Sequence, residues 1–144
     1  MAENKDHLWK SPEDGPEKIE DLVKGGSHPV GIDVGTSKVV VARKKGKDIE
    51  AASELNAFIP VPYSRITESM LGQNNIQYYR EGDELIIYGT ATEKFANMFN
   101  ANTRRPMAKG MLNPRERFAM PVLEAIIQNL IPKSRVAGEV LAFS

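Results

Sequence analysis

The sequence predicts an α/β domain whose mixed sheet begins with antiparallel hairpin strands and continues through a helix into a returning parallel strand. Three observations support this prediction: a valine-rich hairpin at residues 30–42, an apolar stripe at helical spacing from Phe118 to Leu130, and an apolar segment at residues 138–144. Crossover connections within one sheet are right-handed. The last strand should therefore lie parallel to the first, with the helix covering one face of the sheet.

An acidic tail, residues 1–28, precedes the predicted domain at residues 29–144. The tail carries seven acidic and four basic side chains and is rich in Pro and Gly, a composition that favours a mobile chain. Residues 16–24 have the pattern of a short helix, which together with Leu8 and Trp9 offers an apolar face to a partner. So short a segment does not overcome the cost of helix nucleation, and we expect it to fray in solution.

The first hairpin of the domain holds the most informative motif. Asp33 lies near the end of the first strand, Gly35-Thr36-Ser37 reads as a tight turn, and Lys38 begins the second strand. Gly35 lets the backbone approach a ligand, and successive N–H groups in such a turn form a concavity that binds anions. Thr36 and Ser37 add hydroxyl donors, and Lys38 adds a positive charge. This turn is therefore a candidate site for the phosphate chain of a nucleotide.

The carboxylate beside the turn predicts a metal ion. Asp33 would repel phosphate on its own, so a cation should lie between them, and Mg²⁺ held through water suits that position. A Walker-type phosphate loop does not fit, because the glycine spacing is one residue short and Lys38 follows the hydroxyl residues instead of preceding them. The simplest alternative is a plain β-hairpin with an Asp at its turn.

The motif Asp-Val-Gly-Thr-Ser-Lys-Val at residues 33–39 resembles the first phosphate-binding motif of the actin-like ATPases, and it is most similar to bacterial actin homologues of the FtsA and MreB type. Residues 88–94 and 105–111 look like the MreB pattern of a Gly-led helix followed by Arg-Pro-x-x-x-Gly. The resemblance implies an actin-like, ribonuclease-H-like half-domain that binds ATP and Mg²⁺. Lys38 stands where many relatives carry Asn, Thr or Ser.

The resemblance also implies a role for each residue of the motif. Asp33 would orient hydrated Mg²⁺. The β- and γ-phosphates of ATP would contact Gly35, Thr36, Ser37 and Lys38. In the family, the second phosphate loop, the adenosine pocket and the residue that orients the attacking water come later in the chain. We therefore expect the 144 residues alone to be inactive, with the catalytic residue unknown.

Two further strand regions follow the first hairpin. Residues 44–47 form a basic turn, most simply a solvated one, and residues 55–61 are apolar and bounded by prolines, which suits a third strand near a sheet edge. Residues 77–79 and 85–88 flank a polar Arg-Glu-Gly-Asp turn. This arrangement predicts a second hairpin.

Capping signals predict the helices. Thr90 and Glu93 fit a capping box for a helix that runs to Phe99, with Phe95, Met98 and Phe99 on its inner face. A longer helix should begin at Asn113-Pro114, as N-cap and first helical residue, and end at Pro132. Pro121 predicts a kink or a restart in it. Residues 138–144 then form a strand in which the chain stops. We interpret this unfinished strand as a truncation, because an exposed one promotes aggregation.

Composition excludes several classes of function. Acidic and basic residues balance at 19 each, so no overall field attracts nucleic acid or anionic lipid. Cysteine is absent and both histidines, His7 and His28, lie in the tail, which excludes thiol nucleophiles, Cys-ligated zinc and a Ser-His-Asp triad in the body. No apolar run approaches the roughly 20 residues of a membrane span, and no signal-peptide core follows Met1. We therefore expect a cytoplasmic protein.

The leading interpretation is the first lobe of an ATP-binding or ATP-hydrolysing actin-like protein of the cytoskeletal or cell-division type, with self-association into filaments as an expected interaction. One alternative is a sugar or acetate kinase of the same superfamily. It ranks lower because many sugar kinases carry Gln where this chain has Val34. Another alternative is a scaffold that binds ATP without hydrolysing it.

Overall fold

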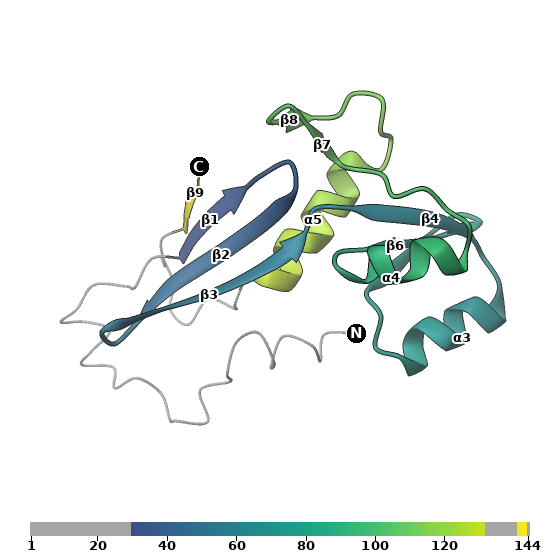
Figure 1. Cartoon of the computed structure of the whole chain (residues 1–144), viewed down its shortest axis with the longest axis horizontal. Coiled ribbons are helices and arrows are strands. Elements are labelled where there is room, and N and C mark those ends of the chain that lie inside the picture. The colour runs from purple at the N-terminus through teal and green to yellow at the C-terminus, as the bar shows by residue number, and fades with distance from the viewer. Residues whose placement is uncertain (1–29, 132–140, 144) are drawn as a thin grey trace.

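A four-stranded mixed sheet forms one half of the molecule (Figure 1). The computed structural model describes residues 30–131 and 141–143. The strands lie in the order β3-β2-β1-β9, where β1 and β2 are antiparallel, β2 and β3 are antiparallel, and β9 is parallel to β1. Their bounds are β1 Val30–Val34, β2 Lys38–Lys45, β3 Asp48–Leu55 and β9 Leu141–Phe143. The predicted hairpin and the parallel direction of the last strand are confirmed.

A three-stranded antiparallel sheet in the order β4-β6-β5 forms the other half. Its strands are β4 Phe58–Pro62, β5 Tyr78–Glu81 and β6 Glu84–Tyr88, and the helices near it are α3 Arg65–Gln73 and α4 Ala91–Met98. The predicted hairpin is confirmed, with Gly82 at a positive φ of 60° in its turn. The core of this half consists of Ile59, Val61, Leu71, Leu85, Ile87 and Phe95.

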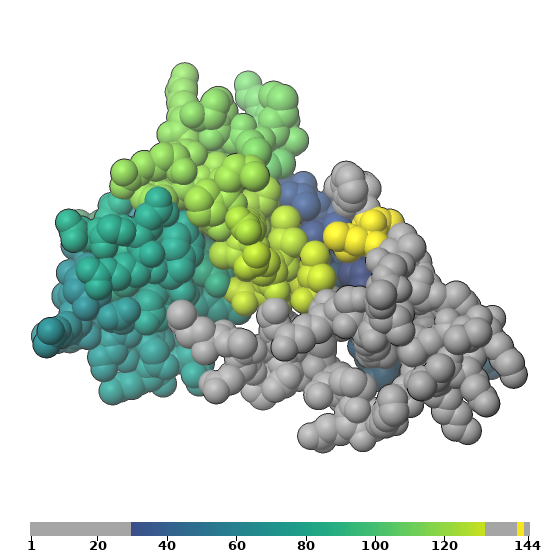
Figure 2. All heavy atoms as spheres, turned by 180° about the vertical axis from the view of Figure 1, so that it is seen from behind, coloured from purple at the N-terminus to yellow at the C-terminus, as the bar shows by residue number. Residues whose placement is uncertain are grey.

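Helix α5, Ala119–Leu130, joins the two sheets. The predicted stripe of Phe118, Val122, Ile126 and Leu130 is at most 1% exposed. It packs in one cluster with residues of both sheets: Val30, Ile32, Val39, Val41, Ala52, Phe58, Ile86 and Tyr88. Figure 2 shows α5 in yellow-green at the middle of the rear face, with the second sheet in teal on one side and β9 in yellow on the other. A short hairpin of β7, Met107–Ala108, and β8, Met111–Leu112, projects beside it.

The strand predicted at residues 55–61 is present only from Phe58, as β4, so its predicted start was wrong. β3 ends at Leu55 and β4 begins at Phe58, in a different sheet. Between them, Asn56 N donates to Ser37 O and Gly89 N donates to Ala57 O, so these two residues connect the sheets instead of continuing a strand. The position of β4 at a sheet edge is as predicted, and helix α3 was not predicted.

The start of the long helix also differs from the prediction. α5 begins at Ala119, because Asn113 caps a separate turn in which its Oδ1 accepts from Arg115 N at 3.1 Å. Pro121 thus falls in the first helical turn, where its missing N–H costs no hydrogen bond within the helix, so the kink or restart expected there is not found.

The expected capping box of α4 does not form. The hydroxyl and the backbone N–H of Thr90 both donate to the carboxylate of Glu54, on β3, instead of closing a box with Glu93. On the same helix Phe95 is buried, but Met98 is 59% exposed and does not face the core. The Glu54 carboxylate, from β3, thus lies at the N-terminus of α4, where negative charge is favoured.

The expected tail at residues 1–28 and most of the predicted last strand lie outside the described residues, which resume at Leu141. In the part of the chain that the structure describes, no helix is both long and apolar enough to cross a membrane.

Phe118 should be a large contributor to stability, because its ring is 1% exposed and meets the Phe58 ring edge-on at 6.0 Å, where the two sheets and α5 converge. We expect Phe118→Ala to lower the free energy of unfolding by roughly 3–5 kcal/mol in urea titrations. Met120 is 59% exposed on the same helix. Met120→Ala should change the free energy of unfolding by no more than about 0.5 kcal/mol, and an equal loss in both variants would contradict this packing.

Candidate functional site

The candidate site is the turn that connects β1 to β2. Gly35 N donates to Lys38 O at 2.9 Å, which leaves Thr36 and Ser37 at the tip of the turn. Asp33 is exposed on the face of β1 opposite the buried Ile32, two residues before Gly35. The structure therefore brings all five predicted site residues into one short segment at the end of the first hairpin.

The carbonyl groups of this turn accept hydrogen bonds from Asn56 and Arg105. Asn56 Nδ2 donates to Gly35 O at 2.8 Å, and Asn56 N donates to Ser37 O at 2.9 Å. A guanidinium nitrogen of Arg105 lies 3.4 Å from both Thr36 O and Ser37 O. Among the described residues, the backbone N–H groups of Thr36 and Ser37 have no acceptor. These amides are therefore free to donate to a ligand, which an anion-binding turn would require.

The hairpin of β7 and β8 lies against the same turn. Lys109 and Gly110 form its tip with φ of 53° and 75°, as a two-residue hairpin turn requires. Gly110 N donates to Thr36 Oγ1 at 3.2 Å. A hydroxyl that accepts one hydrogen bond keeps its own proton to donate, so Thr36 can still donate to a ligand.

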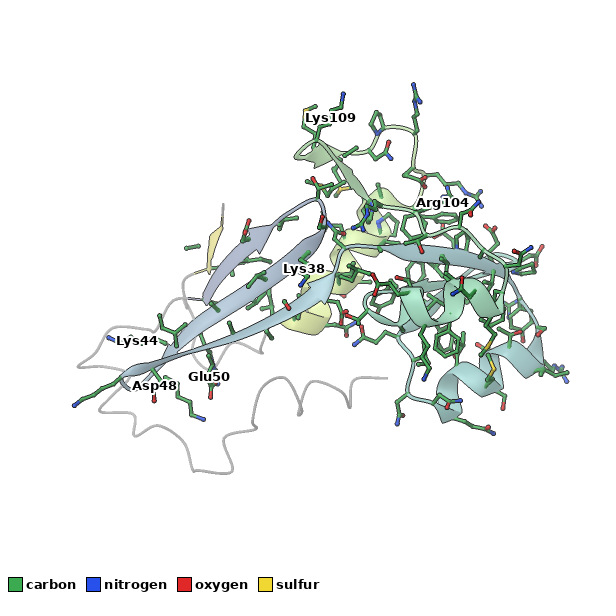
Figure 3. All side chains as sticks on the ribbon, in the orientation of Figure 1. Lys38, Lys44, Asp48, Glu50, Arg104 and Lys109 are labelled. Atoms are coloured by element: carbon green, nitrogen blue, oxygen red, sulfur yellow. The ribbon has the colours of Figure 1, made fainter. Side chains whose placement is uncertain are left out.

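Besides Arg105, three charged side chains lie around the turn: Lys38, Lys109 and Asp33. Lys38 is exposed at the start of β2, and Lys109 is exposed at the tip of the β7–β8 hairpin (Figure 3). Asp33 is the nearby carboxylate on β1. Within residues 30–131 and 141–143, no group of three or more His, Cys, Asp or Glu is arranged to hold a metal ion. A single carboxylate beside this turn could hold Mg²⁺ only with water and ligand oxygens completing its coordination.

Gly35 has a structural role in addition to the predicted one. A β-carbon at this position would lie 3.0 Å from Lys38 O, closer than carbon and oxygen normally approach. That carbonyl accepts the hydrogen bond that closes the turn. A side chain at residue 35 would therefore disturb the turn itself before it met any ligand.

The sequence interpretation missed Asn56 and Arg105. Asn56 is fully buried, and it lies within residues 55–61, which the sequence predicts as one apolar strand. A lone amide side chain in such a segment was the signal that could have identified it, because buried polar groups are normally hydrogen-bonded. Arg105 was noted as part of a motif, but its partners are 68 and 69 residues away in sequence.

Comparison with known proteins places the chain in a family. The family model described as Volactin matches residues 29–144, well over half of the sequence. The chain belongs to the Volactin family. The match includes the β1–β2 turn, both sheets and α5, so every residue of the candidate site lies within the family domain. No curated protein and no solved structure matches this Volactin-family chain.

Proposed function

We propose that this protein binds ATP with Mg²⁺ as an actin-like protein, and that the turn between β1 and β2 is its first phosphate-binding loop. The observation that supports the proposal is the backbone of the turn: the carbonyls of Gly35, Thr36 and Ser37 all accept from Asn56 or Arg105, while the N–H groups of Thr36 and Ser37 have no described acceptor. A phosphate chain offers the acceptors that these amides lack.

We assign each residue of the turn a separate role in holding Mg²⁺-ATP. The amides of Thr36 and Ser37, with their hydroxyls, donate to phosphate oxygens, and Lys38 offsets part of the negative charge. Asp33 would hold Mg²⁺ through water, and the ion, when bound, would supply positive charge beside the phosphates. Phosphoryl transfer depends mainly on positioning and charge neutralisation, which this turn can supply. We assign no residue to the orientation of the attacking water.

The proposal also includes where the protein acts in the cell and whether it self-associates. An actin-like protein of the cytoskeletal or cell-division type would act in the cytoplasm and associate with further copies of itself. The motif at residues 33–39 is the basis for this assignment. A scaffold that binds ATP without hydrolysing it would use the same turn, so binding and turnover have to be measured separately.

Titration of the complete gene product with ATP, with and without Mg²⁺, tests the proposal. We expect ATP to bind only weakly without Mg²⁺, and adenosine, which lacks phosphates, to bind more weakly than Mg²⁺-ATP. Equal affinity for ATP and adenosine would contradict a phosphate-binding role for the turn. Release of inorganic phosphate, followed under saturating Mg²⁺-ATP, then separates an ATPase from a non-hydrolysing scaffold.

A further inference from the structure

We propose that Asn56 is a positioning residue, which together with Arg105 orients the peptide groups of the β1–β2 turn so that their N–H groups face a phosphate chain. This inference rests on the proposed function and adds to it two residues outside the phosphate motif. Neither residue is expected to touch ATP. Both act on the turn through hydrogen bonds to its carbonyl groups.

The planar peptide bond fixes the direction in which each N–H group of the turn points. In a trans peptide, the C=O of one residue and the N–H of the next lie in one plane and point in opposite directions. Asn56 Nδ2 donates to Gly35 O at 2.8 Å, so the N–H of Thr36 points away from Asn56. Arg105 lies 3.4 Å from Thr36 O, so the N–H of Ser37 points away from Arg105.

The next peptide group is fixed in the same sense. Ser37 O accepts from Asn56 N at 2.9 Å and lies 3.4 Å from the Arg105 guanidinium, which turns the N–H of Lys38 away from both. Three consecutive carbonyls are thus held by donors of the protein body. The N–H groups of Thr36 and Ser37, which have no acceptor among the described residues, are left on the other side, where an anion could accept from both.

Burial of Asn56 indicates that its role goes beyond filling space. The side chain is 0% exposed, and its Oδ1 has no hydrogen-bond partner among the described residues. An unsatisfied buried oxygen is destabilising, so stability alone would favour an apolar residue at this position. The single donor that the amide supplies, Nδ2 to Gly35 O, gives a reason for a polar residue there.

Two matched variants separate positioning from general packing. Asn56→Ala removes the donor to Gly35 O. Gln77→Ala removes another amide whose oxygen is buried without a described partner, but Gln77 lies in the second half of the molecule, before β5. Asn56→Asp keeps the shape of the side chain and replaces the donor with a second oxygen, which repels Gly35 O. Each variant is made in the complete gene product and titrated with Mg²⁺-ATP and with adenosine.

We expect Asn56→Ala and Asn56→Asp to weaken Mg²⁺-ATP binding by at least about tenfold, because a hydrogen bond that orients the phosphate donors is lost. Adenosine affinity should stay unchanged in both, and Gln77→Ala should bind both ligands as the wild type does. Wild-type affinity for Mg²⁺-ATP in the Asn56 variants would overturn the inference and leave the proposed function standing. An equal loss of ATP and adenosine binding in the Asn56 variants would also overturn the inference.

Absence of Mg²⁺-ATP binding by the wild type would instead overturn the proposed function. Should the Asn56 variants fail to fold, Arg105→Gln provides the test, because Arg105 is partly exposed and approaches two of the three turn carbonyls, Thr36 O and Ser37 O. We expect this variant to lose Mg²⁺-ATP affinity and to keep adenosine affinity. Unchanged ATP binding in folded Arg105→Gln would then overturn the inference.

Discussion

Gly35→Ala should abolish nucleotide binding by the complete gene product. The added β-carbon would lie 3.0 Å from Lys38 O, which accepts the hydrogen bond that closes the turn. Backbone N–H groups bind phosphate oxygens only at about 3 Å, so a shift of a few tenths of an ångström in the turn removes several hydrogen bonds together. Thermal unfolding with and without Mg²⁺-ATP measures the effect, and the ligand-induced rise in melting temperature should disappear.

Gly46→Ala is the control for this substitution. Gly46 lies in the turn at the other end of β2, and no atom lies within 4 Å of a β-carbon built there. Its φ of 60° is unfavourable for alanine by about 1 kcal/mol, so the variant should melt earlier but keep the full ligand-induced shift. A ligand-induced shift of wild-type size in Gly35→Ala would show that phosphate does not bind at this turn.

Asp33→Ala should lower ATP hydrolysis by at least about a hundredfold, the usual effect of removing a positioned electrostatic group. Asp33 is exposed on the outer face of β1, and its removal leaves the buried Ile32 and the core unchanged. The fold should therefore survive, and the loss should appear in turnover and in the dependence on Mg²⁺ concentration. Phosphate release measured across a range of Mg²⁺ concentrations distinguishes these effects.

Asp48→Ala provides the matched control for Asp33. Asp48 is an exposed acidic residue at the start of β3, at the end of the β2–β3 hairpin far from the candidate turn (Figure 3). Its replacement changes net charge by the same amount and should leave turnover and the magnesium requirement unchanged. Near-normal hydrolysis in Asp33→Ala, or an equal loss in Asp48→Ala, would show that Asp33 does not place the metal ion.

The periodicity of apolar residues in the sequence predicted the strand and the helix whose own residues bury one regular face. Val39 and Val41 bury one face of β2, the stripe from Phe118 to Leu130 buries one face of α5, and both elements are found as predicted. β3 was missed because its sequence, Asp-Ile-Glu-Ala-Ala-Ser-Glu-Leu, contains one β-branched residue and buries only Ala52 fully. Its strand structure depends on pairing with β2 along all eight residues.

Contacts between distant residues could not be predicted from one sequence. Glu54 replaces Glu93 at the N-terminus of α4 from 36 residues before Thr90, and Gly110 reaches Thr36 over 74 residues. Asn56 lies 21 residues from Gly35 and reaches it only because the chain crosses between sheets at that point. The sequence thus predicts the residues that would face the phosphate, whereas the groups behind the turn depend on the tertiary structure.

A crystal structure of the complete gene product with Mg²⁺ and a non-hydrolysable ATP analogue tests the central claim most directly. We predict phosphate oxygens within about 3.2 Å of the backbone nitrogens of Thr36 and Ser37, with a water ligand of Mg²⁺ hydrogen-bonded to Asp33. The account would be contradicted by a triphosphate bound elsewhere, for example in the cavity of about 360 Å³ lined by Glu54, Gln77, Tyr88 and Thr90, with the β1–β2 turn left free.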